Sequence, residues 1–259
     1  MIWTIRQRSD LGALRAIRQG QGPKIVLLHG VGLRAEAWGA QIGPLSQGFE
    51  VIAPDMAGHG ESATLAGEIS LGRYSDLVAE VIEESALVVG HSMGAMIALD
   101  LAARYPQKVR GVVALNSIFE RSPEAAKAVR KRAAGLSESA VGDPTPTLLR
   151  WFDDLQSPEA LACRDWLIGA DPKGYKAAYG VFATSDGPSR SALAALEMPA
   201  LFMTGALEPN STPAMSQAMA SLAPKGRAVI VEGAAHMMPM THGDEVNRAI
   251  LALAAEVLG

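Results

Sequence analysis

The ten residues 86–95, ALVVGHSMGA, constrain the fold of this chain more than any other stretch. The apolar run from Ala86 to Val89 is typical of a buried strand, and small and apolar residues at helical spacing begin at Gly94. Ser92 lies between them in a Gly-x-Ser-x-Gly pattern, so the chain must turn sharply from a strand into a helix. A residue at such an apex is expected to have a positive φ, and the flanking glycines let the strand and helix backbones approach each other. The pattern predicts a strand, a tight turn and a helix with one hydroxyl at the apex.

Ser92 at this turn is a candidate nucleophile. The turn lifts its hydroxyl clear of the sheet and aims the N-terminus of the following helix, with its free N–H groups, at whatever the hydroxyl attacks. A serine hydroxyl is a weak nucleophile at neutral pH, so it needs a base to take its proton and an acid to orient that base.

Short apolar strands alternate with helices on both sides of the turn, which is typical of a mostly parallel, doubly wound α/β sheet. Two short pieces before them, at residues 2–8 and 14–18, predict an antiparallel hairpin at a sheet edge. The expected strands are 24–28, 50–53, 86–89, 109–115, 200–204 and 228–231, and the expected helices include 35–46, 72–84, 212–222 and 244–258.

The alternation stops near residue 118 and resumes near residue 199. Between these points, a capping side chain stands before a proline four times, which predicts four helix starts. We therefore expect a core domain formed by residues 1–118 and 199–259, and a helical cap formed by residues 119–198 over the strand ends. The four predicted starts are Ser122-Pro123, Thr145-Pro146, Ser157-Pro158 and Asp171-Pro172.

The turn at Ser92 and the order of the elements resemble the α/β-hydrolase fold, in which the nucleophile lies on such an elbow. The segment 55–62, DMAGHGES, is similar to the Asp-x-x-Gly-x-Gly-x-Ser turn of these proteins and is interpreted as structural. The loop at 29–38 is similar to that of pimeloyl-carrier-protein methyl esterases, although Val31 stands where those enzymes have tryptophan. The loops at 205–213 and around His236 are similar to those of enol-lactonases and small carboxylesterases. The resemblance covers nearly the whole chain and implies the serine carboxylesterase and enol-lactonase branch.

The resemblance implies a catalytic order of serine, acid and histidine along the chain. Glu208 and His236 each follow a predicted strand, so both are expected to meet Ser92 at the carboxyl edge of the sheet. We interpret His236 as the base and Glu208 as the acid. Glu120 remains an alternative acid, and His242 is a weaker alternative base.

An oxyanion hole formed by the backbone N–H groups of Val31 and Met93 is also implied by the resemblance. His29 and His59 lie in turn motifs and are expected to be structural, and His91 is expected to point away from Ser92. The residues expected to line the substrate pocket are Gly30, Gly32, Trp38, Ile118, Trp151, Phe182, Leu207 and Met237.

Composition excludes several kinds of protein. With 259 residues, 49% of them hydrophobic, the chain is long and apolar enough for one large core. The single cysteine, Cys163, excludes an internal disulfide framework and four-cysteine zinc sites, and it is interpreted as a small core or helix residue. The net charge of -4 does not indicate a nucleic-acid partner. Neither a signal-peptide pattern nor an apolar run of membrane-spanning length is visible, so we expect a cytoplasmic protein that does not bind membranes.

These features predict a serine hydrolase that cleaves an ester, lactone or thioester through an acyl-enzyme on Ser92, without a metal or organic cofactor. The apolar and aromatic cap favours an uncharged, small to medium acyl group. The basic run 130–132 is interpreted as a solvated helix face, with an acidic partner such as a carrier protein as the alternative. A carbon–carbon bond hydrolase or an acyltransferase with the same three residues, and a small-molecule receptor, are the alternative functions. Relatives that cleave carbon–carbon bonds usually have Ser-Gly-Pro-Gly in the first loop, and residues 31–34 depart from that pattern.

Overall fold

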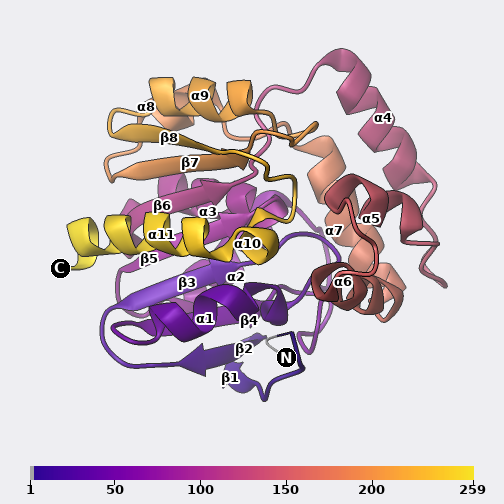
Figure 1. Cartoon of the computed structure of the whole chain (residues 1–259), viewed down its shortest axis with the longest axis horizontal. Helices are drawn as coiled ribbons and strands as arrows, with labels where there is room; N and C mark the ends of the chain where they lie inside the picture. Colours follow the sequence, from indigo (N-terminus) through magenta and orange to yellow (C-terminus); the bar gives the residue numbers. More distant parts are fainter. Residues whose placement is uncertain (1–2) are drawn as a thin grey trace.

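The computed structural model describes residues 3–259 and has one eight-stranded sheet in the order β1-β2-β4-β3-β5-β6-β7-β8 (Figure 1). Neighbouring strands from β4 through β3 to β8 are parallel, whereas β2 pairs antiparallel with β4 and with the edge strand β1. This arrangement confirms the predicted mostly parallel α/β sheet of the α/β-hydrolase fold. The strands are β1 (Ser9–Leu11), β2 (Leu14–Gln19), β3 (Lys24–Leu28), β4 (Glu50–Asp55), β5 (Ala86–His91), β6 (Val109–Leu115), β7 (Ala200–Gly205) and β8 (Gly226–Val231).

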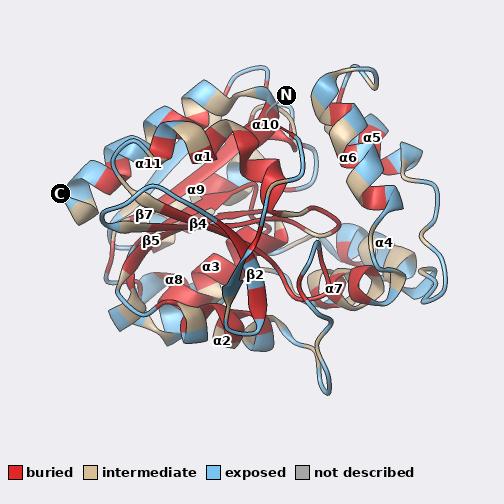
Figure 2. Cartoon of the chain, turned by 90° about the horizontal axis from the view of Figure 1, so that it is seen from below, coloured by how far each residue is buried: buried red, intermediate tan, exposed pale blue. Residues whose placement is uncertain are grey.

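Helices cover both faces of the sheet (Figure 2). On β3, Val26 and Leu28 pack in the same apolar cluster as residues of α2, α3, α8 and α9. Ile25 and Leu27 point to the opposite face and pack with residues of α1 and α11. Because both faces are covered, the strand shows a continuous apolar run rather than an alternating one. The helices of these two layers are η1 (Ala35–Trp38), α1 (Gly39–Leu45), α2 (Leu71–Val81), α3 (Met93–Arg104), η2 (Pro106–Lys108), α8 (Arg190–Ala194), α9 (Pro213–Leu222), α10 (Met238–Thr241) and α11 (Gly243–Leu258).

The chain between β6 and β7 is helical, as expected. Four of its helices, α4 (Pro123–Ala134), α5 (Thr145–Trp151), α6 (Pro158–Ile168) and α7 (Pro172–Thr184), lie beyond one end of the strands (Figure 1). The fifth, α8, contributes Leu193 to the apolar cluster on the sheet face that α2, α3 and α9 cover. The division of the chain into a core domain and a cap domain stays a prediction.

Three of the four predicted helix starts have the expected side-chain cap. The hydroxyls of Ser122 and Ser157 and the carboxylate of Asp171 each accept a hydrogen bond from the backbone N–H three residues later. The prediction at Thr145 is wrong, because Thr145 is the first residue of α5 and the Asp143 carboxylate accepts its backbone N–H at 2.9 Å. A cap at Ser189, which begins α8, was not predicted.

The predicted strand at residues 2–8 is wrong for residues 3–8, and residue 2 lies outside the described part of the chain. The hairpin exists, but its first strand is only the three residues of β1. Residues 6 and 8 instead contact Glu36: the Arg6 backbone N–H and the Arg8 guanidinium both donate to its carboxylate. Of the helices in residues 3–259, none is long and apolar enough to cross a membrane.

Candidate active site

Ser92 lies at the apex of the predicted turn between β5 and α3, with φ 57° and ψ -119°. A Cβ on Gly90 would collide with the carbonyl of Gly94, and a Cβ on Gly94 would collide with the carbonyl of Leu28. The two glycines therefore allow α3 to pack directly against β5 and β3. The backbone N–H of Ser92 donates to the carbonyl of Leu115 at 2.9 Å, which holds the apex at the end of β6.

Glu208 and His236 meet although they are 28 residues apart. The Nδ1 atom of His236 lies 2.6 Å from Oε2 of Glu208. The carboxylate is buried, and its oxygens also accept hydrogen bonds from the backbone N–H groups of Asn210 and Ser211 and from the Asn116 amide. Burial alone would raise the pKa of Glu208, but His236 and the two backbone N–H groups lower it to about 2. An ionised carboxylate holds the proton of the neutral imidazole on Nδ1, so Nε2 is available to accept a proton.

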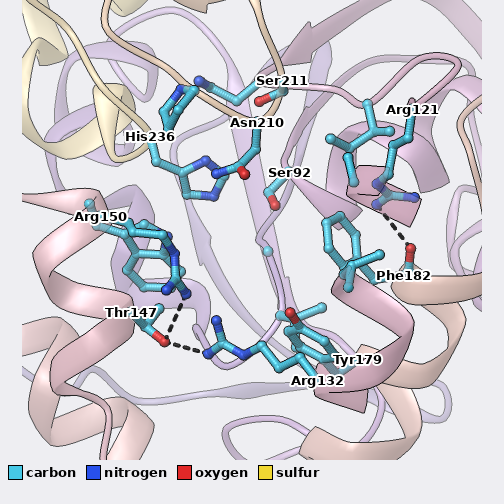
Figure 3. Close-up of a pocket in the computed structure, with 18 of the residues that line it drawn as sticks. Ser92, Arg121, Arg132, Thr147, Arg150, Tyr179, Phe182, Asn210, Ser211 and His236 are labelled. Carbon is cyan, nitrogen blue, oxygen red and sulfur yellow. Dashed lines mark hydrogen bonds between the residues drawn. The ribbon is translucent and has the colours of Figure 1, made fainter. Parts of the chain in front are cut away.

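Ser92 and His236 line the same cavity, which has a volume of about 490 Å³ and lies between the strand ends and the inserted helices (Figure 3). Figure 3 shows both side chains directed into this cavity. The register of the sheet explains why these residues meet: His91 pairs with Leu115, Leu115 with Met203, and Gly205 with Val231, so the loops after β5, β7 and β8 leave at one edge. The structure therefore brings Ser92, Glu208 and His236 together at the carboxyl edge of the sheet.

The alternative acid and base lie elsewhere. Glu120 forms a two-point ion pair with Arg190, with both N–O distances at 2.7 Å and about half of its side chain exposed. His242 shares a hydrogen bond with the hydroxyl of Thr241 and does not line the cavity.

The other three histidines hold loops around the site. His91 is buried, and its Nε2 donates to the backbone carbonyl of His236 at 2.8 Å. His29 donates from Nδ1 to the Gly30 carbonyl and accepts the backbone N–H of Met56 at Nε2. Burial lowers the pKa of both rings to about 3, so both are neutral, and His59 is shifted in the same direction for the same reason. His59 donates from Nδ1 to the carbonyl of Ala57 at 3.2 Å, so His29 and His59 both hold backbone segments, in line with the structural role expected for them.

The two expected oxyanion donors belong to segments that adjoin Ser92. Met93 is the first residue of α3, where helix geometry leaves the backbone N–H without an intrahelical acceptor. Val31 follows Gly30, where a Cβ would lie 3.0 Å from the Cβ of Ser92. The first loop therefore passes within van der Waals distance of the candidate nucleophile.

Gly30, Ile118, Trp151 and Phe182 line the cavity, as expected. The ring of Trp151 stacks on the imidazole of His236 with centroids 5.4 Å apart and planes 21° apart. An aromatic residue of α5 thus contacts the candidate base directly.

Four residues expected at the pocket lie elsewhere. Trp38 is buried in the core between the sheet and α1, because its helical turn faces the sheet. Met237 packs in a separate apolar cluster with residues of α5 and α6, and the Leu207 side chain is 59% exposed. Gly32 has φ 76°, and it lines a smaller second cavity beside His59.

Three arginines that the sequence analysis did not assign to the pocket line this cavity: Arg121, Arg132 and Arg150. The interpretation of residues 130–132 as a solvated helix face is therefore wrong for Arg132. Helical spacing could have found it, since one face of α4 contributes Ala125, Ala128, Val129 and Arg132 to the lining. The sequence analysis also did not identify Asn116, which follows β6, lines the cavity and donates to Glu208.

In residues 3–259, no three His, Cys, Asp or Glu side chains come together as a metal site.

Known proteins resemble this chain over nearly its full length. The profile of a family described as "Alpha/beta hydrolase family" matches residues 25–249. The chain is 35% identical over 258 residues to an (E)-2-((N-methylformamido)methylene)succinate hydrolase of Acinetobacter baylyi. The match covers 97% of this chain and 98% of the relative. It is 29% identical over 239 residues to a pimeloyl-[acyl-carrier protein] methyl ester esterase of Aeromonas hydrophila, covering 87% and 92% of the two chains. A solved structure of a thermophilic esterase from Thermogutta terrifontis with malate bound matches with a TM-score of 0.87 and 26% identity, covering 98% of this chain and all of the other.

Proposed function

Because this chain belongs to the alpha/beta hydrolase family, we propose that it is a serine hydrolase with Ser92 as nucleophile, His236 as base and Glu208 as the orienting acid. The observation that supports this most is the 2.6 Å contact between His236 Nδ1 and Glu208 Oε2, together with the cavity that His236 and Ser92 both line. A buried carboxylate held by backbone N–H groups, an imidazole and a serine on a strained turn are the parts that acyl transfer requires.

The reaction proceeds in two halves. Nε2 of His236 takes the proton of the Ser92 hydroxyl while Oγ attacks the substrate carbonyl, and the oxyanion faces the backbone N–H groups of Val31 and Met93. The imidazolium, stabilised by the Glu208 carboxylate, then gives its proton to the leaving group and the acyl-enzyme forms. Water, deprotonated by the same imidazole, attacks the acyl carbonyl, and Ser92 regains its proton as the acid leaves.

The scissile bond is proposed to be a carboxylic ester, lactone or thioester. The Aeromonas relative and the Thermogutta structure, both described as esterases, support this choice. A second candidate is an amide-type bond, because the substrate in the name of the Acinetobacter relative contains a formamide group. The same residues serve both reactions, since His236 can protonate an amine as well as an alkoxide.

Replacing Ser92 by alanine tests the proposal. We expect Ser92→Ala to lose the burst of p-nitrophenol from a p-nitrophenyl ester and to lower kcat by about 10⁴-fold or more, because the attacking oxygen is gone. Ser221→Ala, on the exposed side of α9, is the matched control and should keep the wild-type burst. An undiminished burst in Ser92→Ala would overturn the proposal.

The alternative functions give different products. Acyl transfer would appear as new esters when alcohols compete with water, and carbon–carbon hydrolysis would appear only with substrates that release a carbanion. A receptor would bind a ligand tightly with negligible turnover. Mass spectrometry of the products with ester, lactone, thioester and formamide substrates separates these outcomes from ester hydrolysis.

A further inference from the structure

The charged side chains that line the cavity beside Ser92 all have the same sign. Among the described residues that line it are three arginines and His236, but no aspartate, glutamate or lysine. The whole chain has a net charge of -4, so the positive cavity is a local feature and not a consequence of composition. A partly buried positive charge without a counter-ion favours an anionic ligand.

The charge of Arg121 is already neutralised. Its Nη1 lies 2.9 Å from Oδ1 of Asp186 and also donates to the carbonyl of Ser185, and its Nη2 donates to the carbonyl of Phe182. Its guanidinium lies 4.5 Å from the centroid of the Phe182 ring. Arg121 therefore ties α7 to the segment after β6 and has little capacity for a ligand.

Arg132 and Arg150 are in a different position. Both donate to the hydroxyl of the buried Thr147, at 2.5 Å and 3.4 Å, and they reach it from two helices, α4 and α5 (Figure 3). Neither guanidinium takes part in an ion pair with a carboxylate of residues 3–259. Partial burial and, to a smaller extent, repulsion by Arg132 lower the pKa of Arg150. Two guanidiniums held together without a counter-ion form a preformed site for an anion.

We propose that Arg132 and Arg150 bind a carboxylate group of the substrate, whose scissile carbonyl lies at Ser92. The substrate class is then a half-ester or half-amide of a dicarboxylic acid, and not the uncharged acyl group expected from the cap's composition. The two guanidiniums are turned toward the cavity, across it from Ser92 and His236 (Figure 3). The position of the carboxylate relative to the reacting carbonyl rests on the proposed function, whereas the affinity for the anion does not.

Two esters that differ only in charge test the substrate class. 4-Nitrophenyl hydrogen adipate has a free carboxylate, and 4-nitrophenyl methyl adipate has a neutral methyl ester at the same place; the four-carbon spacer keeps the carboxylate from cleaving its own ester. We expect kcat/KM of the wild type to be at least tenfold higher for the acidic ester. Arg132→Gln and Arg150→Gln should each lower it about 10- to 100-fold for the acidic ester and less than threefold for the neutral one, because a charge-assisted hydrogen bond is lost.

Arg130→Gln is the matched control. It removes the same charge two residues from Arg132, and Arg130 does not line the cavity, so both esters should keep their wild-type kcat/KM. Arg132→Lys keeps the charge and should retain part of the preference for the acidic ester. Circular dichroism of each variant checks that a loss of activity does not come from a loss of folding. Equal losses for both esters, or a wild-type preference for the neutral ester, would overturn the proposal.

Ligand binding separates this inference from the proposed function. In Ser92→Ala, calorimetry should detect succinate but not dimethyl succinate, and Arg150→Gln in that background should weaken succinate binding at least tenfold. Tighter binding of inorganic phosphate than of succinate would contradict the assignment of a carboxylate. If succinate binds in this way but neither ester acylates Ser92 in the wild type, the proposed chemistry fails while the anion site stands.

Discussion

At the scale of single residues, Glu208 is held more firmly than any solvated carboxylate could be. Its oxygens accept from the imidazole of His236, two backbone N–H groups and the Asn116 amide, and the side chain is buried. The backbone N–H of Glu208 donates to the carbonyl of Gly205 at 3.2 Å, which closes the turn that carries the carboxylate. The carboxylate therefore stays ionised and fixes one tautomer of the imidazole.

Neutralising this carboxylate should disable the candidate base. We expect Glu208→Gln to lower kcat by about 10³- to 10⁴-fold, because the amide can stabilise the wrong tautomer and cannot compensate the imidazolium. Steady-state hydrolysis of a p-nitrophenyl ester measures the effect. Glu120→Gln, which loses only a surface ion pair with Arg190, should keep kcat within twofold. A Glu208→Gln enzyme as active as Glu120→Gln would remove Glu208 from the mechanism.

At the scale of elements, the strand–turn–helix unit at Ser92 depends on the absence of side chains. A Cβ at Gly90 would collide with the backbone of α3, which cannot move without displacing Ser92. Gly180, in the middle of α7, has no atom outside its own helix within 4 Å of the place where a Cβ would stand. The same substitution should therefore have opposite effects at these two glycines.

Gly90→Ala should destabilise the protein by roughly 3 kcal/mol or more, because the helix must shift to relieve the overlap. Gly180→Ala should raise the free energy of unfolding by about 0.5–1 kcal/mol, since alanine restricts the unfolded chain and favours the helix. Urea unfolding followed by circular dichroism measures both changes. Equal stability of the two variants would show that the close packing at Gly90 is not required.

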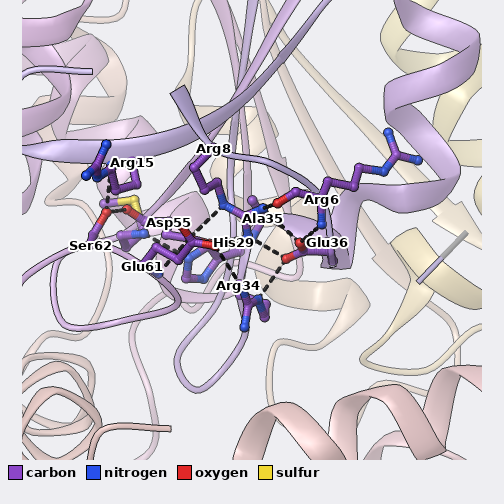
Figure 4. A network of polar contacts seen from close by, with 11 residues as sticks. Arg6, Arg8, Arg15, His29, Arg34, Ala35, Glu36, Asp55, Glu61 and Ser62 are labelled. Atoms are coloured by element: carbon purple, nitrogen blue, oxygen red, sulfur yellow. Dashed lines mark hydrogen bonds and ion pairs between the residues drawn. The ribbon is translucent and has the colours of Figure 1, made fainter. Parts of the chain in front are cut away.

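At the scale of the whole molecule, a buried charge network joins three segments that are distant in sequence (Figure 4). Arg8 donates to the carboxylates of Glu36 and Asp55 with N–O distances from 2.6 to 3.2 Å, and all three side chains are almost fully buried. Asp55 also accepts the backbone N–H of Ala35. The network thus attaches the N-terminal segment and the end of β4 to the loop that contains Val31.

Breaking this network should cost stability in a pH-dependent way. Burial opposes ionisation of Glu36, but Arg8, the Arg6 backbone N–H and Arg34 lower its pKa from 4.5 to about 2. A carboxyl with a lowered pKa stabilises the fold fully above pH ~4.5 and loses that contribution as the pH falls toward 2. Glu36→Gln should therefore be less stable than the wild type by about 3 kcal/mol at pH 7, and the gap should narrow to about 1 kcal/mol at pH 3.

Urea unfolding at the two pH values measures this gap. Glu61→Gln is the control. The Glu61 side chain is half exposed, and its Oε1 lies 3.9 Å from Nη2 of Arg34, which is too far for a hydrogen bond. Loss of this charge should therefore change the free energy of unfolding by less than about 0.5 kcal/mol. A gap that stays constant between pH 7 and pH 3 would contradict the role assigned to the ionised Glu36.

The sequence by itself determined the features that depend on local pattern. Short apolar runs mark the strands, and the parallel order of those strands places Ser92, Glu208 and His236 at one edge. The strand at residues 109–115 was predicted with the bounds that the structure has, and the helix expected at 212–222 begins one residue later, at Pro213, with Thr212 as its cap. Where the pattern was weak, as at residues 3–8, the prediction of a strand failed because a buried ion pair holds the chain instead.

Only the tertiary structure decided what surrounds the serine. Arg132 and Arg150 come from two helices, and nothing in the local sequence of either one specifies that they meet at Thr147. Trp38 and Trp151 are equally apolar, yet one is buried in the core and the other covers His236. Helix formation depends on residues within a few positions, whereas the lining of a cavity depends on how whole helices pack, and that packing sums many weak contacts between residues far apart in the chain.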